Sequence, residues 1–307
     1  DSPIRWSSVV MHVGTLFAGA WIMYFRKKTV REAYELVAGD KKRYDGVWAQ
    51  LLEREPLGIG RICEVVRRSG VSASQVAQPR QMRDGGGRVP EKSLDALYKA
   101  ARECNWELRD RVRKWGKASG GSLFRRNDGF DDRDKDRFVR ARSVEEDNRR
   151  IPSLAKASWD GLDDDFVLPA CGRLSREAWC GGAEVEWCKM KSPLRAIEKI
   201  YRIYEGDSSW LVDLCRQSII FDDTLALSRC LEAILSDPDV HVERIKCRYD
   251  SSYDSSLTCG YRDVAINMRI GGRLHVCELL LILKNFALLK RSEGHSRYRT
   301  FRNLRGI

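Results

Sequence analysis

The sequence lacks the patterns that identify several common enzyme classes. It contains no Walker-type phosphate loop, no dinucleotide-binding glycine pattern, no nucleophile elbow and no repeat of fixed period. Its ten cysteines include no Cys-x-x-Cys pair, so the usual spacing of a zinc site is absent. Scattered cysteines of this kind favour buried thiols in a reducing compartment over a disulfide framework. These absences argue against P-loop nucleotidases, dinucleotide-dependent dehydrogenases and α/β-hydrolases.

Charge and size narrow the possibilities further. The chain has 307 residues, 43% of them apolar, which is enough for about two domains with a real core. Its 55 basic and 44 acidic residues leave a net charge of +11. Such a balance indicates an anionic partner, which could be nucleic acid, a membrane face or acidic neighbouring subunits. Nucleic acid is the least favoured, because Glu107 and Asp110 interrupt the basic face of the helix expected over 91–115.

The N-terminal stretch is the longest run without charge. Residues 9–25 contain no Asp, Glu, Lys or Arg, and a helix from Trp6 to Phe25 would span about 30 Å. Aromatic side chains at Trp6, Trp21 and Tyr24 occupy interfacial positions, and basic residues follow from Arg26. The pattern predicts an uncleaved transmembrane anchor over residues 1–28. A buried helix of a soluble domain is the alternative, because the strictly apolar run is only 17 residues long and includes His12.

Two further expectations concern this N-terminal stretch. Small residues stand four apart at Gly14 and Ala18 and at Thr15 and Gly19, a spacing that lets a second helix approach closely. An anchor with such a face is expected to dock into a larger membrane complex, with the basic bulk of the chain on the stromal or matrix side. Because the chain begins with Asp1, we expect a sequence that is truncated or processed.

The middle of the chain divides into two regions. Residues 29–116 have the apolar spacing of helices, including a stripe over 91–115 that suits packing against a partner or other helices. Residues 117–183 are dense in charge and poor in periodic apolar positions, which predicts a charged linker or extended arm. The expected organisation is therefore an anchor, a helical region, a charged linker and a C-terminal domain over 184–307.

The C-terminal part alternates between strand and helix patterns. A strand is expected at Lys189–Pro193, then a helix to Tyr204, a strand after Asp213 and a helix from Thr224 to Ser236. Three more strands are expected at 240–248, 264–270 and 274–283, with Gly271-Gly272 as a hairpin turn. The predicted class is α+β, with a mixed domain built on a five-stranded sheet.

This order resembles the synthetase domain of the RelA/SpoT family, whose nucleotidyltransferase-like fold transfers pyrophosphate from ATP to the 3′-hydroxyl of GDP or GTP. The family's basic strand-to-helix signature, its two metal-binding acids and its guanine-stacking tyrosine each have a counterpart here. The resemblance implies nucleotide-binding positions at Lys189, Lys191, Arg195, Lys199 and Tyr261, and catalytic or Mg²⁺-binding acids at Asp213 and Glu278. It covers about a third of the chain, and it describes a degenerate domain.

The departures from the family pattern are in the surroundings of the two acids. Arg216 and Ser218 replace the glycine and arginine that follow the first acid, and Arg195 replaces the signature serine. Leu280 replaces a glutamine after the second acid, and an apolar side chain cannot orient a phosphate or a metal-bound water. Without the family, two carboxylates on neighbouring strands still suit Mg²⁺, while ordinary solvated charges are the alternative.

Three functions compete on these grounds. The favoured one is a structural accessory subunit of an organellar membrane complex, in which the degenerate domain is a docking module. A thylakoid photosystem is preferred over a mitochondrial inner-membrane complex. The alternatives are a guanosine tetraphosphate or pentaphosphate synthetase and a nucleotide-binding regulator without turnover, for which ATP, GDP or GTP are the ligands. No cofactor is expected unless the acids bind Mg²⁺. The expected partners are other subunits and the lipid bilayer.

Overall fold

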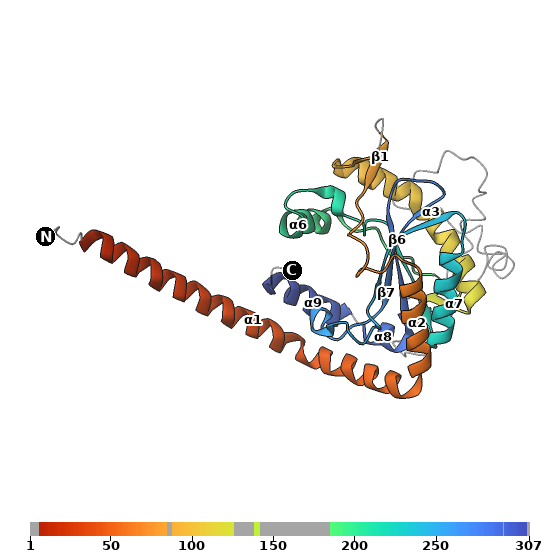
Figure 1. Cartoon of the computed structure of the whole chain (residues 1–307), viewed down its shortest axis with the longest axis horizontal. Coiled ribbons are helices and arrows are strands. Elements are labelled where there is room, and N and C mark those ends of the chain that lie inside the picture. The colour runs from red at the N-terminus through yellow and green to blue at the C-terminus, as the bar shows by residue number, and fades with distance from the viewer. Residues whose placement is uncertain (1–5, 85–87, 126–137, 142–184, 291, 306–307) are drawn as a thin grey trace, which may run out of the picture.

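The computed structural model describes residues 6–84, 88–125, 138–141, 185–290 and 292–305. Its helices are α1 (Trp6–Arg54), α2 (Pro56–Arg68), α3 (Leu94–Ser119), α6 (Pro193–Ile203), α7 (Thr224–Leu235), α8 (Lys284–Leu289) and α9 (Ser292–Arg305). Its strands are β1 (Met82–Asp84), β2 (Arg88–Pro90), β3 (Ser122–Phe124), β4 (Phe138–Arg140), β5 (Arg216–Phe221), β6 (Val240–Cys247), β7 (Val264–Ile270) and β8 (Cys277–Leu283). The chain is thus mixed α/β, and its long first helix extends away from the rest (Figure 1).

The main sheet has six strands in the order β4-β3-β5-β8-β7-β6. Strands β5 and β8 run parallel, and every other neighbouring pair is antiparallel. The predicted five-stranded sheet was therefore wrong in its membership. β3 and β4 come from the range expected to be a charged linker, and the strand expected at Lys189–Pro193 is irregular chain leading into α6. Most of the predicted charged linker, residues 126–137 and 142–183, lies outside the described residues.

One face of the sheet is apolar and covered by α2, α3 and α7 (Figure 1). Leu108 and Val112 of α3 are fully buried, as are Ile219 of β5 and Leu281 of β8. Gln217 points to the same side, because its Nε2 donates to Asn105 Oδ1 of α3 at 3.1 Å. Side chains alternate along a strand, so the neighbours of Gln217 on β5 point to the opposite face.

α2 lies unusually close to α7 on this apolar side. A Cβ added to Gly58 would come within 1.8 Å of Thr224 Oγ1. Glu55, just before α2, accepts hydrogen bonds from the backbone N and Oγ1 of Thr224 at 2.8 and 2.5 Å. The start of α7 is thereby tied to the start of α2.

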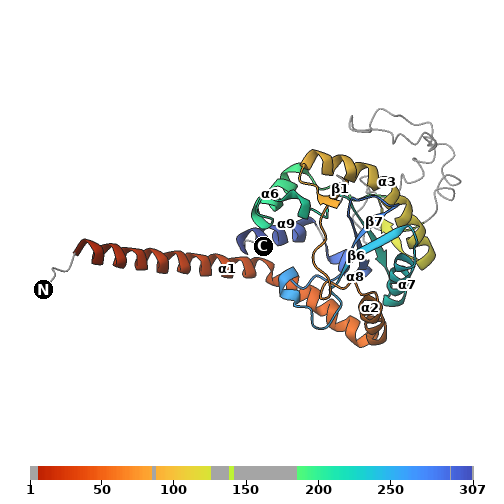
Figure 2. The same cartoon turned by 45° about the horizontal axis from the view of Figure 1, so that its top comes forward.

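α1 is one continuous helix, and only its second part packs on the domain. Ala33 and Val37 are buried with Phe301 of α9, and Asp40 accepts from Arg297 at 2.7 and 2.9 Å. Before these positions the helix stands clear of the rest of the described chain (Figures 1 and 2). Pro56 then begins α2, as expected for a proline at the first turn of a helix.

The transmembrane helix predicted over residues 1–28 was wrong. No helix in the described part of the chain is long and apolar enough to cross a membrane. The apolar run is short, and Gly14, Thr15 and Gly19 contribute little apolar surface to it. The helix also continues without a break through the basic residues that were expected to end an anchor.

Candidate functional site

Asp213 lies between two lysines, in the irregular chain just before β5. Lys191 Nζ donates to its Oδ2 at 2.6 Å, and Lys199 Nζ donates to the same oxygen at 3.0 Å. Lys191 is fixed by its backbone N, which donates to Leu214 O at 3.2 Å, and by its carbonyl, which accepts from Tyr98 of α3 at 2.6 Å. Lys199 comes from α6, which Pro193 begins. Three residues that lie up to 22 positions apart in the chain thus form one buried ion cluster.

The charges of this cluster stabilise one another. Burial alone would raise the pKa of Asp213, but the ammonium groups of Lys199 and Lys191 outweigh it and hold that pKa below its usual range. Burial acts against the charge of Lys199, whose pKa is nevertheless raised because of Asp213. The pKa of Lys191 is lowered, because its burial outweighs the attraction of the same carboxylate. Asp213 is therefore ionised and neutralised at physiological pH.

Glu278 and Arg216 lie beside this cluster on the face of the sheet opposite to α3. Arg216 of β5 is paired with Glu278 of β8, and Glu278 is paired with Asn267 of β7. Asn267 is paired in turn with Arg244 of β6, so the four side chains form a row across the sheet. Burial and the nearby Asp213 raise the pKa of Glu278. The two acids expected from the sequence are thus brought close together.

The β6 end of this row carries unpaired polar atoms. Arg244 is 7% exposed and Asn267 is 4% exposed. Arg244 Nη2 donates to Asn267 Oδ1 at 3.5 Å, but Arg244 Nε and Asn267 Nδ2 have no hydrogen-bond partner. Lys246, two residues along β6, points to the same face. Its burial, with the positive charges of Arg244 and Arg248, lowers the pKa of Lys246 to about 8.

These residues define a surface that we call the cationic face. It consists of Lys191, Lys199, Asp213, Arg216, Arg244, Lys246, Asn267 and Glu278. Sequence reasoning identified four of its members and missed the contribution of β6. The signal was available, because Arg244, Lys246 and Arg248 alternate with Ile245 and Cys247 in a strand whose other side is apolar.

Tyr261 does not join the cationic face. Its ring lies edge-on to Tyr44 of α1 at 5.7 Å and to Phe286 of α8 at 6.5 Å. Lys290 Nζ lies over the same ring, 5.0 Å from its centre. The Tyr261 hydroxyl is buried without a hydrogen-bond partner. The ring expected to stack on guanine therefore packs against α1 and α8.

Two of the predicted basic residues are not part of the cationic face. Lys189 is exposed. Arg195 pairs with Glu198 on its own helix at 2.7 Å, a contact between partly exposed side chains that contributes little to stability.

Of the predicted anchor positions, Trp6 begins α1, whereas Gly14, Ala18, Trp21 and Tyr24 are exposed and Gly19 is half-buried. An added Cβ at Gly14 or Gly19 would meet nothing, so the described chain places no second helix there.

The predicted Mg²⁺ site fits these residues poorly. Both lysines bind the same Asp213 oxygen, which leaves Oδ1 as the one unpartnered oxygen of that carboxylate. Two ammonium groups within 3.0 Å of the carboxylate repel a divalent cation. No group of three or more His, Cys, Asp or Glu side chains in the described ranges could hold a metal ion. The acids are better placed to balance the lysines than to bind a metal.

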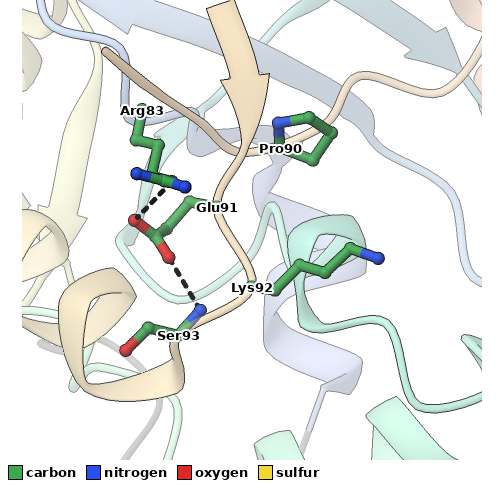
Figure 3. A pocket seen from close by; sticks show the side chains of 5 residues that line it. All are labelled: Arg83, Pro90, Glu91, Lys92 and Ser93. Carbon is green, nitrogen blue, oxygen red and sulfur yellow. Dashed lines mark hydrogen bonds and ion pairs between the residues drawn. The ribbon is translucent and has the colours of Figure 1, made fainter. Parts of the chain in front are cut away.

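A pocket of about 490 Å³ lies elsewhere, beside the β1–β2 hairpin (Figure 3). Glu91 accepts from the backbone N of Ser93 at 2.7 Å and pairs with Arg83 at 3.9 Å. Lys92 points away from that pair and lies 3.7 Å from Asp207. Each charged side chain that lines this pocket therefore has an ion-pair partner, unlike Arg216, Arg244 and Lys246 of the cationic face.

Comparison of the chain with protein-family models, with curated proteins and with solved structures finds no match. The reading of the site therefore rests on its own geometry.

Proposed function

We propose that the chain is a non-catalytic accessory subunit of a multiprotein complex. The first part of α1, residues 12–28, joins the subunit to its partners, and the α/β domain is a docking module. The observation that carries this proposal is the row of large apolar side chains that α1 exposes away from the domain. We call residues 12–28 the arm.

The arm exposes far more apolar surface than a monomer normally tolerates. Leu16 is 74% exposed, Phe17 72% and Trp21 67%. Ile22, Met23, Tyr24 and Phe25 follow directly, between 44% and 72% exposed. Consecutive positions point in all directions around a helix, so the arm is apolar on every side. Enclosing each such side chain contributes about 1.5–3 kcal/mol, which favours a partner that surrounds the arm with several helices.

Two features of the domain support a docking role over catalysis. A synthetase of the RelA/SpoT kind needs an acid that is free to bind metal, but Asp213 is engaged by two lysines. It also needs an aromatic ring that is free to stack on a base, but Tyr261 packs against Tyr44 and Phe286. Both features support the interpretation of the domain as degenerate.

The arm can be tested by substitution in the full chain. Replacing Leu16, Phe17, Trp21 and Ile22 by Gln removes the apolar surface and leaves a helix-compatible sequence. Expressed with a tag in the native host, the unaltered chain is expected in a particle much larger than its own 35.2 kDa. The fourfold variant is expected as a free subunit with a nearly unchanged melting temperature, because these side chains are mostly exposed and the one ring contact among them, Trp21 with Phe25, lies within α1. Native gel electrophoresis and mass photometry provide the readout.

Leu57→Gln is the matched control. Leu57 is 89% exposed on α2, outside the arm. It should leave the particle unchanged. A fourfold variant that stays in the same particle, or a control that leaves it equally, would contradict the proposal.

The resemblance to the RelA/SpoT synthetase domain and the organellar location, thylakoid before mitochondrion, stay predictions. A nucleotide-binding regulator is the second candidate, favoured by the unpaired cations of Arg216, Arg244 and Lys246 on the cationic face.

A further inference from the structure

The cationic face holds more positive charge than the described chain balances. Five cations stand against the two carboxylates of Asp213 and Glu278, and both lysines at Asp213 share one oxygen. The remaining three cations, Arg216, Arg244 and Lys246, form no ion pair within the described residues. Uncompensated charge of this kind is costly away from water and is typical of sites that bind anions.

Unused hydrogen-bond donors point to the same conclusion. Arg244 and Asn267 are more than nine-tenths buried, yet Arg244 Nε and Asn267 Nδ2 lack acceptors. A buried donor normally has a partner, so these two indicate an acceptor-rich ligand. Arg216, Lys246 and Glu278 are partly exposed, which leaves the face open to an incoming molecule.

The span of the face indicates the length of the ligand. Arg216 on β5 and Arg244 on β6 are separated by three strand spacings. With about 4.8 Å between neighbouring strands, their backbones lie about 14 Å apart. A single phosphate can contact only part of such a row, whereas a chain of linked phosphates offers acceptors along it.

Two aromatic rings of the described residues, those of Tyr261 and Tyr204, lie near the elements of this face, and each already has partners. The ring of Tyr261 packs against Tyr44 and Phe286, with Lys290 over it. Tyr204, at the end of α6, has Lys199 Nζ 5.2 Å from its ring centre, and its hydroxyl accepts from Gln78 at 3.2 Å. Both rings are already in use. Recognition at this face therefore falls to the phosphates alone.

We propose that the cationic face binds an inorganic condensed phosphate, such as tripolyphosphate, through Arg216, Arg244, Lys246 and the amide of Asn267. The site needs no Mg²⁺, because its own cations neutralise the ligand. It provides no contact for a nucleoside, so the added base of a nucleotide brings no affinity.

Isothermal titration calorimetry of the full chain in EDTA tests this proposal. Sodium tripolyphosphate is expected to bind with a Kd in the micromolar range, at least about tenfold more tightly than orthophosphate. ATP and GDP are expected to bind no more tightly than tripolyphosphate. Arg244→Gln is expected to weaken tripolyphosphate binding about tenfold or more, because it removes a charge-assisted contact.

Two further variants make the result decisive. Lys246→Gln removes a partly exposed cation of the same face and serves if Arg244→Gln does not fold; it too should weaken binding about tenfold. Arg229→Gln makes the same change of net charge on the exposed side of α7, behind the apolar face, and should leave the Kd unchanged. The proposal is overturned by no binding, by ATP or GDP binding about tenfold more tightly than tripolyphosphate, or by an equal loss in Arg229→Gln.

Discussion

Lys246 is expected to destabilise the free protein, and its removal should therefore increase stability. Its pKa falls to about 8 from an ordinary value of 10.5, first because of burial and then because of Arg244 and Arg248. That difference corresponds to about 3 kcal/mol of unfolding free energy at neutral pH. Since part of the side chain reaches solvent, screening reduces it, and we expect Lys246→Gln to stabilise the fold by about 1–3 kcal/mol.

The pH dependence gives this prediction its sign. Below the folded pKa of about 8 the lysine is charged in both the folded and unfolded states, so the full cost is present. Between that pKa and 10.5 the unfolded chain binds more protons than the folded one, and the stability of the unaltered chain rises with pH. The advantage of Lys246→Gln should accordingly shrink to about half by about pH 9.5.

Urea denaturation of both proteins at about pH 7 and pH 9.5 measures the difference directly. Arg229→Gln again provides the control, since its exposed charge lies on the other side of the sheet and should change stability by less than about 0.5 kcal/mol. A Lys246→Gln variant that is less stable than the unaltered chain at pH 7 would refute the idea that the face carries excess charge.

Two other substitutions test the packing and the ion pairs. Gly58→Ala should destabilise the fold by about 1–3 kcal/mol in urea denaturation, because the added Cβ would meet Thr224. Gly60→Ala is the control and should be neutral or stabilising, because a Cβ there meets nothing. Equal effects at both sites would contradict the close contact of α2 with α7. Asp263→Asn should lower the free energy of unfolding by about 3 kcal/mol, because Asp263 is 2% exposed and the substitution leaves Arg248 without its carboxylate partner. An unchanged melting temperature would show that this ion pair is dispensable.

Local patterns in the sequence predicted many of the elements, and their three-dimensional neighbours much less well. The strands expected at 264–270 and 274–283 correspond to β7 and β8, because alternation of apolar and polar side chains is a local property. Asp213 and Glu278 were expected together, and the parallel pairing of β5 with β8 brings them close. These predictions required only the positions of the strands in the sequence and the pairing of β5 with β8.

The wrong predictions concern elements and side chains whose structure is determined by tertiary contacts rather than by local sequence. β3 and β4 are three residues each, too short and too charged in their surroundings to show periodicity, and they are strands because β5 provides an edge. Tyr261 was placed in a site because of the resemblance to the family's guanine-stacking tyrosine, but Tyr44 of α1, more than 200 residues earlier, supplies a ring against which it packs. The length of α1 was missed because a charged cluster reads equally well as a helix end or as a solvated helix face.

Anion binding without Mg²⁺ at the cationic face requires that Asp213 is neutralised by Lys191 and Lys199 and is therefore unavailable as a metal ligand. The most direct measurement is the tripolyphosphate affinity of Asp213→Asn, with and without Mg²⁺. We predict a lower melting temperature for the free variant, whose lysines lose their counter-ion, together with a tripolyphosphate affinity that rises about tenfold in either condition. An affinity that falls in Asp213→Asn would contradict the neutralisation of this carboxylate by the lysines. Binding that requires Mg²⁺ in the unaltered chain and loses that requirement in Asp213→Asn would show that Asp213 binds metal.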